Sequence, residues 1–335
     1  MITLEYDRLV FRFPDVHEDA VCSIDFQRTL RIPDNGKDYP LPPGLGSFPL
    51  RHLDDHAKRL PENWLKRGGV MLPMSQAEAM WLHFGANRGW DGYPFAVKIG
   101  TGKINAVTGE SWTNHLNRDP QDYVAVPKQP WLDGYCVEKG VIRQFVAMPL
   151  GDGYSVEEQL TGEAEWGGVQ ILVYPMKAER YEALVKARLG LREVRCDSLF
   201  SRAPVAAMGL SAGGRMKQEI YEDPYELADY DQRNGRRCFV TILNSAAWLA
   251  TTGERAPIQP PTAKQYTEAG LPWFDYYDAD AKALGGAELF NKVKSLAWLA
   301  KLKGDAPADV DKPVAVVRVH KLGPSRAVHV REAEL

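Results

Sequence analysis

The chain has 335 residues, of which 44% are hydrophobic and 25% are charged, and these proportions exclude a disordered or low-complexity protein. Its 41 basic and 44 acidic residues leave a net charge of −3, too weak a field to predict binding to nucleic acid or to an anionic membrane. No stretch approaches the about 18 apolar residues that a spanning helix needs, and the N-terminus lacks the apolar segment of a secretory signal. We therefore expect a soluble, cytoplasmic protein.

The first half of the chain predicts strands. Residues 22–32 alternate apolar and polar side chains, which is typical of a long strand with one buried face, and only Arg28 breaks the apolar side. The four prolines and two glycines of residues 38–50 exclude a helix or a central strand there. Ser75-Gln76-Ala77-Glu78 has the pattern of a capping box and predicts a helix over residues 76–84.

Proline ends each strand predicted between residues 122 and 175. These strands cover 123–126, 141–148 and 169–174, and a helix at 178–189 follows them. The second half mixes elements. A strand at 238–243 precedes a helix that begins at the capping box Thr262-Ala263-Lys264-Gln265, a helix at 287–303 and a strand near 315–319.

These elements predict an α+β, β-rich fold, with mostly antiparallel sheets in the N-terminal half and helices concentrated in the C-terminal half. We expect a β-rich domain at 1–175, a helix and connecting loop at 176–204, and a mixed region at 205–335 that can pack as one unit with the first.

Several blocks resemble a widespread, uncharacterised microbial family whose members often carry the label "integral membrane protein". The blocks are TLRIPDNGKDYPLPPGLGSFP (29–49), PQDYVAVPKQPWLDG (120–134), residues 141–175 and GLSAGGRMKQEIYEDP (209–224). The resemblance covers most of residues 29–276 and implies no activity, cofactor or catalytic residue. Hydropathy does not support the label, because no segment is long and apolar enough to cross a bilayer.

One motif permits a hydrolase. Gly209-Leu210-Ser211-Ala212-Gly213 matches the G-x-S-x-G turn that exposes a nucleophilic serine between a strand and a helix. Asp275 or Asp278, and then His320, follow in the order that a Ser–Asp–His triad requires. Against this, the upstream sequence lacks the alternation of a parallel sheet, and a glycine-rich structural turn is the competing interpretation.

Two other groups are candidate ligand or interface residues. Gly213, Gly214 and Arg215 could cradle a phosphate through backbone N–H groups and one positive charge. Trp273, Tyr276 and Tyr277 lie among carboxylates, an arrangement that suits sugar stacking or a protein interface. The alternative is that Trp273 fills the core after a helix.

No pair among Cys22, Cys136, Cys196 and Cys238 has the spacing of a zinc site, so we predict no metal and no cofactor. We predict a non-enzymatic structural or binding protein that self-associates as a homo-oligomer, without nucleic acid, without a membrane span and with an unknown small-molecule ligand. The alternative function is a serine hydrolase that uses Ser211.

Overall fold

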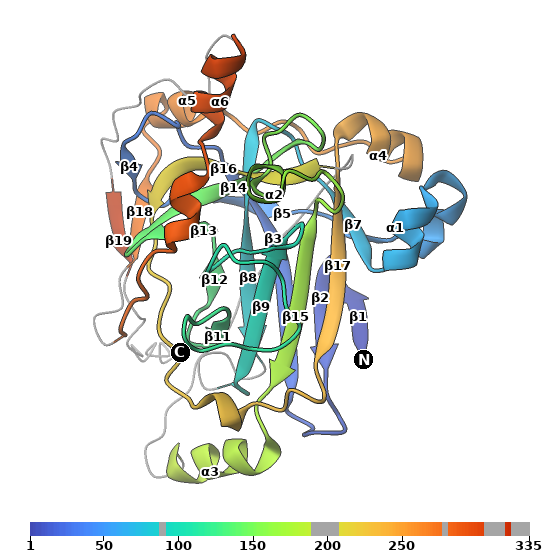
Figure 1. The fold of residues 1–335 in the computed structure, drawn as a ribbon, viewed down its shortest axis with the longest axis vertical. Helices are drawn as coiled ribbons and strands as arrows, with labels where there is room; N and C mark the ends of the chain where they lie inside the picture. Colours follow the sequence, from blue (N-terminus) through green and yellow to red (C-terminus); the bar gives the residue numbers. More distant parts are fainter. Residues whose placement is uncertain (87–91, 189–207, 277–280, 305–318, 323–335) are drawn as a thin grey trace, which may run out of the picture.

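The computed structural model describes residues 1–86, 92–188, 208–276, 281–304 and 319–322, and it shows a β-rich α+β protein (Figure 1). Antiparallel pairs join most strands, and the described helices are few and lie mostly in the second half of the chain. The predicted fold class is therefore confirmed. No helix in these ranges is both long and apolar enough to cross a bilayer.

One group of antiparallel strands is built around β3 (Val21–Leu30), which lies between β2 (Arg8–Arg12) and β8 (Glu78–Ala86). β1 (Ile2–Glu5) pairs with β2 and borders the group (Figure 1). Two short strands complete it, with β5 (Gly44–Ser47) beside the second half of β3 and β12 (Trp131–Leu132) beside β8.

A second group surrounds β15 (Val169–Pro175), which lies between β9 (Phe95–Thr101) and β17 (Arg236–Leu243). β10 (Ile104–Asn105) and β11 (Val124–Val126) pair with β9. β17 also pairs with β7 (Val70–Pro73), which runs parallel to it, and β7 pairs in turn with β6 (Arg51–His52).

β14 (Val141–Pro149) and β16 (Met208–Lys217) connect the two groups. β14 pairs with β8, with β13 (Gly134–Glu138) and with β16. β16 meets β17 at one residue pair and β4 (Asp38–Tyr39) in parallel. These pairings place strands from the regions 1–175 and 205–335 in one sheet. β18 (Trp273–Tyr276) and β19 (Val319–Leu322) form a separate parallel pair.

The helices are short. They are α1 (Glu62–Arg67), α2 (Val156–Thr161), α3 (Ala178–Arg188), α4 (Ser245–Thr252), α5 (Ala263–Glu268) and α6 (Leu296–Lys303), with 3-10 helices at Asp54–Arg59, Leu227–Asp229 and Glu288–Lys292. The capping box predicted at Thr262 and Gln265 is present at the start of α5, and Gly304 ends α6 in the left-handed conformation.

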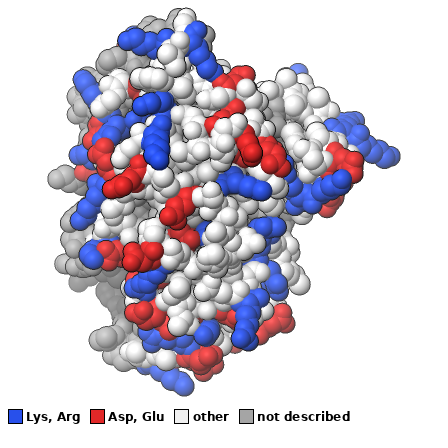
Figure 2. Space-filling model, viewed as in Figure 1, with Lys and Arg blue, Asp and Glu red and all other residues white. Residues whose placement is uncertain are grey.

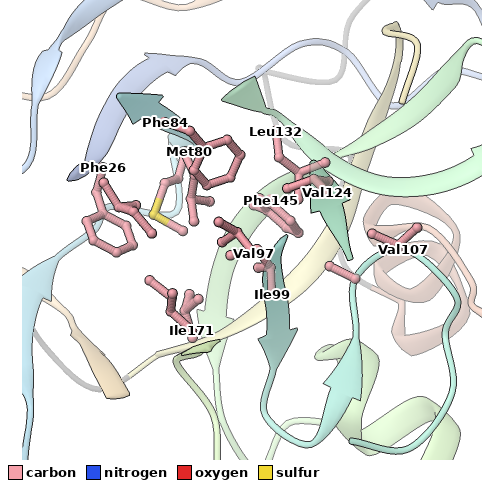
Figure 3. Packing of buried hydrophobic residues seen from close by; sticks show 14 of the residues in the cluster. Phe26, Met80, Phe84, Val97, Ile99, Val107, Val124, Leu132, Phe145 and Ile171 are labelled. Carbon is pink, nitrogen blue, oxygen red and sulfur yellow. The ribbon is translucent and has the colours of Figure 1, made fainter. Parts of the chain in front are cut away.

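The core lies where side chains from both strand groups meet. Figure 3 shows Phe26 of β3 and Met80 of β8 in one cluster with Val97 of β9 and Ile171 of β15. All four are fully buried. The strand predicted at residues 22–32 is confirmed as β3, which ends at Leu30. Cys22, Ile24 and Phe26 are buried in this core, while Ser23, Asp25 and Gln27 take the opposite face.

The helix predicted over residues 76–84 is wrong, because these residues belong to β8. Only half of the capping box forms: the Ser75 N–H donates to Glu78 Oε1 at 2.8 Å, but the Ser75 hydroxyl accepts from the Ala77 N–H at 3.2 Å and not from that of Glu78. Glu78 also accepts a 2.7 Å hydrogen bond from the buried Arg28, the residue that broke the apolar side of β3. Pairing with β3 along nine residues outweighs the local helix signal.

The helix predicted over residues 287–303 is divided in two. A 3-10 helix ends at Val293, and α6 begins after Ser295, whose hydroxyl accepts from the Trp298 N–H. A local cap therefore starts a new helix where the apolar pattern indicated a continuous one. Residues 189–207 and 305–318 lie outside the described ranges, and so do most of the loop predicted at 176–204 and the strand predicted near 315–319.

Candidate functional site

The G-x-S-x-G segment is the middle of a strand. Gly209–Gly213 lies within β16, which continues to Lys217, so no helix follows the motif directly. Ser211 is fully buried, and its hydroxyl donates a 2.7 Å hydrogen bond to the Tyr154 carbonyl. Both the hydrolase turn and the glycine-rich structural turn are therefore wrong here, because the segment has extended, sheet-paired backbone.

The glycines of β16 allow close packing against neighbouring chain segments. The pairing with β14 shifts between Arg143 and Phe145, so that two residues, Gly213 and Gly214, face one. A Cβ at Gly214 would lie 2.7 Å from the Pro33 carbonyl oxygen, and one at Gly213 would lie 2.6 Å from Val146. Packing at this bulge explains the glycines, and the backbone forms no phosphate cradle.

Arg215 holds strands together at the surface. Its guanidinium donates to Asp38 of β4 at 2.7 Å and to both carboxylate oxygens of Glu138 of β13, at 2.8 and 3.0 Å. These bonds raise the pKa of Arg215 and lower that of Glu138. The fork of donors is thus occupied by the protein's own carboxylates.

The other two members of the hydrolase triad lie in the β18–β19 pair. Asp275 pairs with Lys321, and the neighbouring Phe274 pairs with His320. The structure therefore brings Asp275 and His320 close in register but places Ser211 in the large sheet. The side chain of His320 is not among those described.

Trp273 fills the core, as the alternative interpretation of the sequence predicted. It is fully buried, lies against Tyr39 and Tyr266, and donates from its indole nitrogen to the Thr267 hydroxyl at 3.2 Å. Tyr276 occupies β18 without a described side chain, and Tyr277 lies outside the described residues. No sugar or protein surface is formed by Trp273 itself.

A different constellation, which we name the outer-face row, crosses five strands on the face of the sheet opposite the core. Its members are directly paired, one to the next, and they are Glu5 (β1), Arg8 (β2), Asp25 (β3), His83 (β8) and Trp131 (β12). Directly opposed residues of antiparallel strands point to the same face, so the five side chains form one line.

Asp25 is the centre of the outer-face row. One carboxylate oxygen accepts from Arg8 Nε at 2.8 Å and the other faces His83 Nδ1 at 3.1 Å. The Asp25 side chain is 6% exposed, whereas those of Arg8 and His83 are 35% and 40% exposed. The carboxylate therefore orients two exposed polar groups from the neighbouring strands.

Two aromatic residues are neighbours of His83 in the sheet. Trp131 is its direct partner on β12, and the ring of Trp81, two residues away on β8, lies edge-on to the imidazole at 6.0 Å between centroids. Both indoles are partly exposed. Gln27, the partner of Trp81, donates to the Ser47 hydroxyl at 2.6 Å and continues the polar surface onto β5.

Trp131 of the outer-face row contacts a buried carboxyl group, that of Asp133. Asp133 follows β12, and desolvation raises its pKa to about 7 while a hydrogen bond from the Trp131 side chain lowers it. Its Oδ2 atom has no hydrogen-bond partner among the described residues. The Asp133 N–H donates to Gln218 Oε1 at 2.9 Å.

The sequence contained only part of the signal for the outer-face row. Alternation along residues 22–32 places Asp25 on the polar face. Because the sequence predicts a helix for residues 76–84, it does not indicate that His83 pairs with Asp25. Sequence spacing alone does not reveal the register of strands whose paired residues lie 58 positions apart.

Charged groups elsewhere are mixed. Figure 2 shows Lys and Arg interspersed with Asp and Glu over the visible face. Among the described residues, no group of three or more His, Cys, Asp or Glu side chains could hold a metal ion. The described cysteines Cys22, Cys136 and Cys238 are buried, and burial raises the pKa of each thiol.

No protein-family model, no curated protein and no solved structure matches this chain.

Proposed function

We propose that this chain is a non-enzymatic binding protein that self-associates, and that copies meet at the edge formed by β1. An edge strand presents backbone N–H and C=O groups that have no partner in its own sheet and can pair with a second chain. β1 pairs with β2 on one side and carries no proline or lysine that would hinder such pairing. A second copy is the partner that this edge fits.

The single observation that carries this proposal is the exposed Tyr6 at the end of β1. Glu5 pairs with Arg8, so Tyr6 and Asp7 alone form the turn, with φ values of 51° and 59°. Such turns favour Asn and Gly, because positive φ is costly for a bulky side chain. Tyr6 is nevertheless fully exposed to solvent. A bulky aromatic residue at a strained, exposed turn position is explained if its ring is buried against a partner.

The turn is fixed from beneath. Asp7 is buried, and its Oδ1 accepts from the Leu50 N–H at 3.1 Å and from Arg51 at 2.9 Å. Arg51 also binds both carboxylate oxygens of Glu254. Tyr6 is thus presented by a rigid support, which lowers the entropy lost when a partner binds.

Charge and symmetry favour a second copy. Antiparallel pairing of β1 with itself about a two-fold axis would satisfy the edge of both copies at once. Glu5 is the one charged residue of β1, and it is neutralised within its own chain by two hydrogen bonds from Arg12, at 2.7 and 3.1 Å. Those bonds lower the pKa of Glu5 to about 2, so the pair persists at neutral pH.

The alternative, a serine hydrolase, loses its support at Ser211. A nucleophile has to reach a substrate and a general base, whereas this hydroxyl is buried and donates to a backbone carbonyl.

Light scattering after size exclusion tests the proposal with the full chain at micromolar concentration. We expect a dimer or larger species for the wild type and at least a tenfold weaker association for Tyr6→Asn. Asn is favoured at positive φ, so this variant should keep or raise the melting temperature, which separates lost association from lost folding. Leu302→Asn, at an exposed position of α6, is the matched control and should associate like the wild type. A monomeric wild type, or equal masses for wild type and Tyr6→Asn, would overturn the proposal.

A further inference from the structure

We propose that the outer face of β2, β3, β8 and β12 binds an uncharged oligosaccharide through Arg8, His83, Trp81 and Trp131. This site goes beyond self-association and does not rest on it. The proposal is based on a line of polar groups that the sheet itself fixes, with the Trp81 ring edge-on to the imidazole of His83 and Trp131 paired with His83 on the neighbouring strand.

The charges on this face favour a neutral ligand. Arg8 pairs with Asp25 at 2.8 Å, and Arg12 pairs with Glu5 at 2.7 Å. Within each ion pair the positive and negative charges cancel, so the outer-face row and the neighbouring Arg12 together carry no net charge from these four side chains. A phosphate or a polyanion would meet no net positive field here, and a cationic ligand would meet no free carboxylate.

Beyond these ion pairs, the outer-face row offers both a hydrogen-bond donor and a hydrogen-bond acceptor to a ligand. Arg8 uses Nε on Asp25, and its terminal nitrogens make no hydrogen bond with any described residue. His83 Nδ1 faces the Asp25 carboxylate, and in the tautomer that donates from Nδ1 the Nε2 atom is an acceptor. A donor and an acceptor two strands apart suit hydroxyl groups, which accept from a guanidinium and donate to an imidazole.

The two indoles supply the apolar part of the site. The C–H face of a sugar ring packs on an aromatic ring, and Trp offers the largest such surface. Both rings are held in place before a ligand arrives. The Trp81 ring lies edge-on to His83 and also packs close to Gly44, since a Cβ built on Gly44 would lie 3.7 Å from the indole. The Trp131 side chain hydrogen-bonds to the buried Asp133. Little side-chain entropy is therefore lost on binding.

Binding to four neutral oligosaccharides tests this proposal. The full chain is titrated by calorimetry with cellotetraose, chitotetraose, maltotetraose and xylotetraose, and a tetragalacturonate serves as the acidic comparison. We expect a dissociation constant in the micromolar to millimolar range for at least one neutral sugar. Trp81→Ala and His83→Ala should each weaken that binding at least tenfold.

Two controls separate a lost site from a lost fold. Trp298→Ala removes an indole that is 47% exposed on α6, remote in sequence from the outer-face row, and should bind like the wild type. Circular dichroism and the melting temperature should show that His83→Ala is folded, since its side chain is largely at the surface. Failure of all four neutral sugars to bind at millimolar concentration would overturn the proposal. So would binding of tetragalacturonate alone, or unchanged affinity in Trp81→Ala.

Discussion

Replacing Asp133 by Asn should stabilise the protein at alkaline pH and remove part of its pH dependence. The carboxyl group is buried, its Oδ2 atom has no hydrogen-bond partner among the described residues, and its pKa is raised from 3.8 to about 7. Desolvation is the main cause, because burial penalises the ionised form, and the hydrogen bond from Trp131 offsets only part of it.

The magnitude follows from linkage between proton binding and folding. A pKa about three pH units higher in the folded chain corresponds to about 4 kcal/mol, at about 1.4 kcal/mol for each pH unit. Below pH 4 the group is protonated in both states and the penalty vanishes. Between pH 4 and pH 7 the unfolded chain releases the proton while the folded chain retains it, so the free energy of unfolding falls as the pH rises. Above pH 7 the loss is complete.

Urea denaturation of wild type and Asp133→Asn between pH 4 and pH 8.5 measures this difference. We expect near-equal free energies of unfolding at pH 4. At pH 8 we expect a variant about 4 kcal/mol more stable, because the pKa of about 7 already includes the effect of the hydrogen bond from Trp131. Asp152→Asn, in an exposed turn, is the control and should show no such trend. A difference that stays constant with pH would refute the reasoning, because it would mean that Asp133 does not titrate between the two states.

Two further predictions concern Ser211 and the packing of β9. A fluorophosphonate probe should label neither the wild type nor Ser211→Ala, and that variant should lose about 1 kcal/mol of stability with its buried hydrogen bond; labelling that disappears in Ser211→Ala would restore the hydrolase. Gly100→Ala should cost about 2 kcal/mol in urea denaturation, because the new Cβ would lie 2.5 Å from Trp112, whereas Gly285→Ala, with no atom within 4 Å of its Cβ, should cost less than half as much. Equal losses for the two glycines would contradict the packing seen at Trp112.

The elements whose signal is local could be predicted from the sequence. Alternation over residues 22–32 predicted β3, and the reciprocal Thr262 and Gln265 pattern predicted α5, because side-chain period and caps depend on neighbouring residues only. The same capping pattern failed at Ser75 and Glu78. There Glu78 binds the distant Arg28, and the backbone of β8 pairs with β3, so tertiary contacts decide the conformation.

Motifs and sites differ in the same way. The glycines of the G-x-S-x-G pattern allow close packing within β16 and form no catalytic turn, since a Cβ would lie 2.9 Å from Ser155 at Gly209 and 2.6 Å from Val146 at Gly213. The outer-face row has no motif, since its five members come from five strands and only strand register brings them together. A shift of one residue between β3 and β8 would turn His83 into the core and leave Asp25 without it. The buried Phe26, Met80 and Phe84 oppose that shift, because their side chains would then face water. The core of this protein therefore fixes the surface geometry on which we base the proposed sugar site.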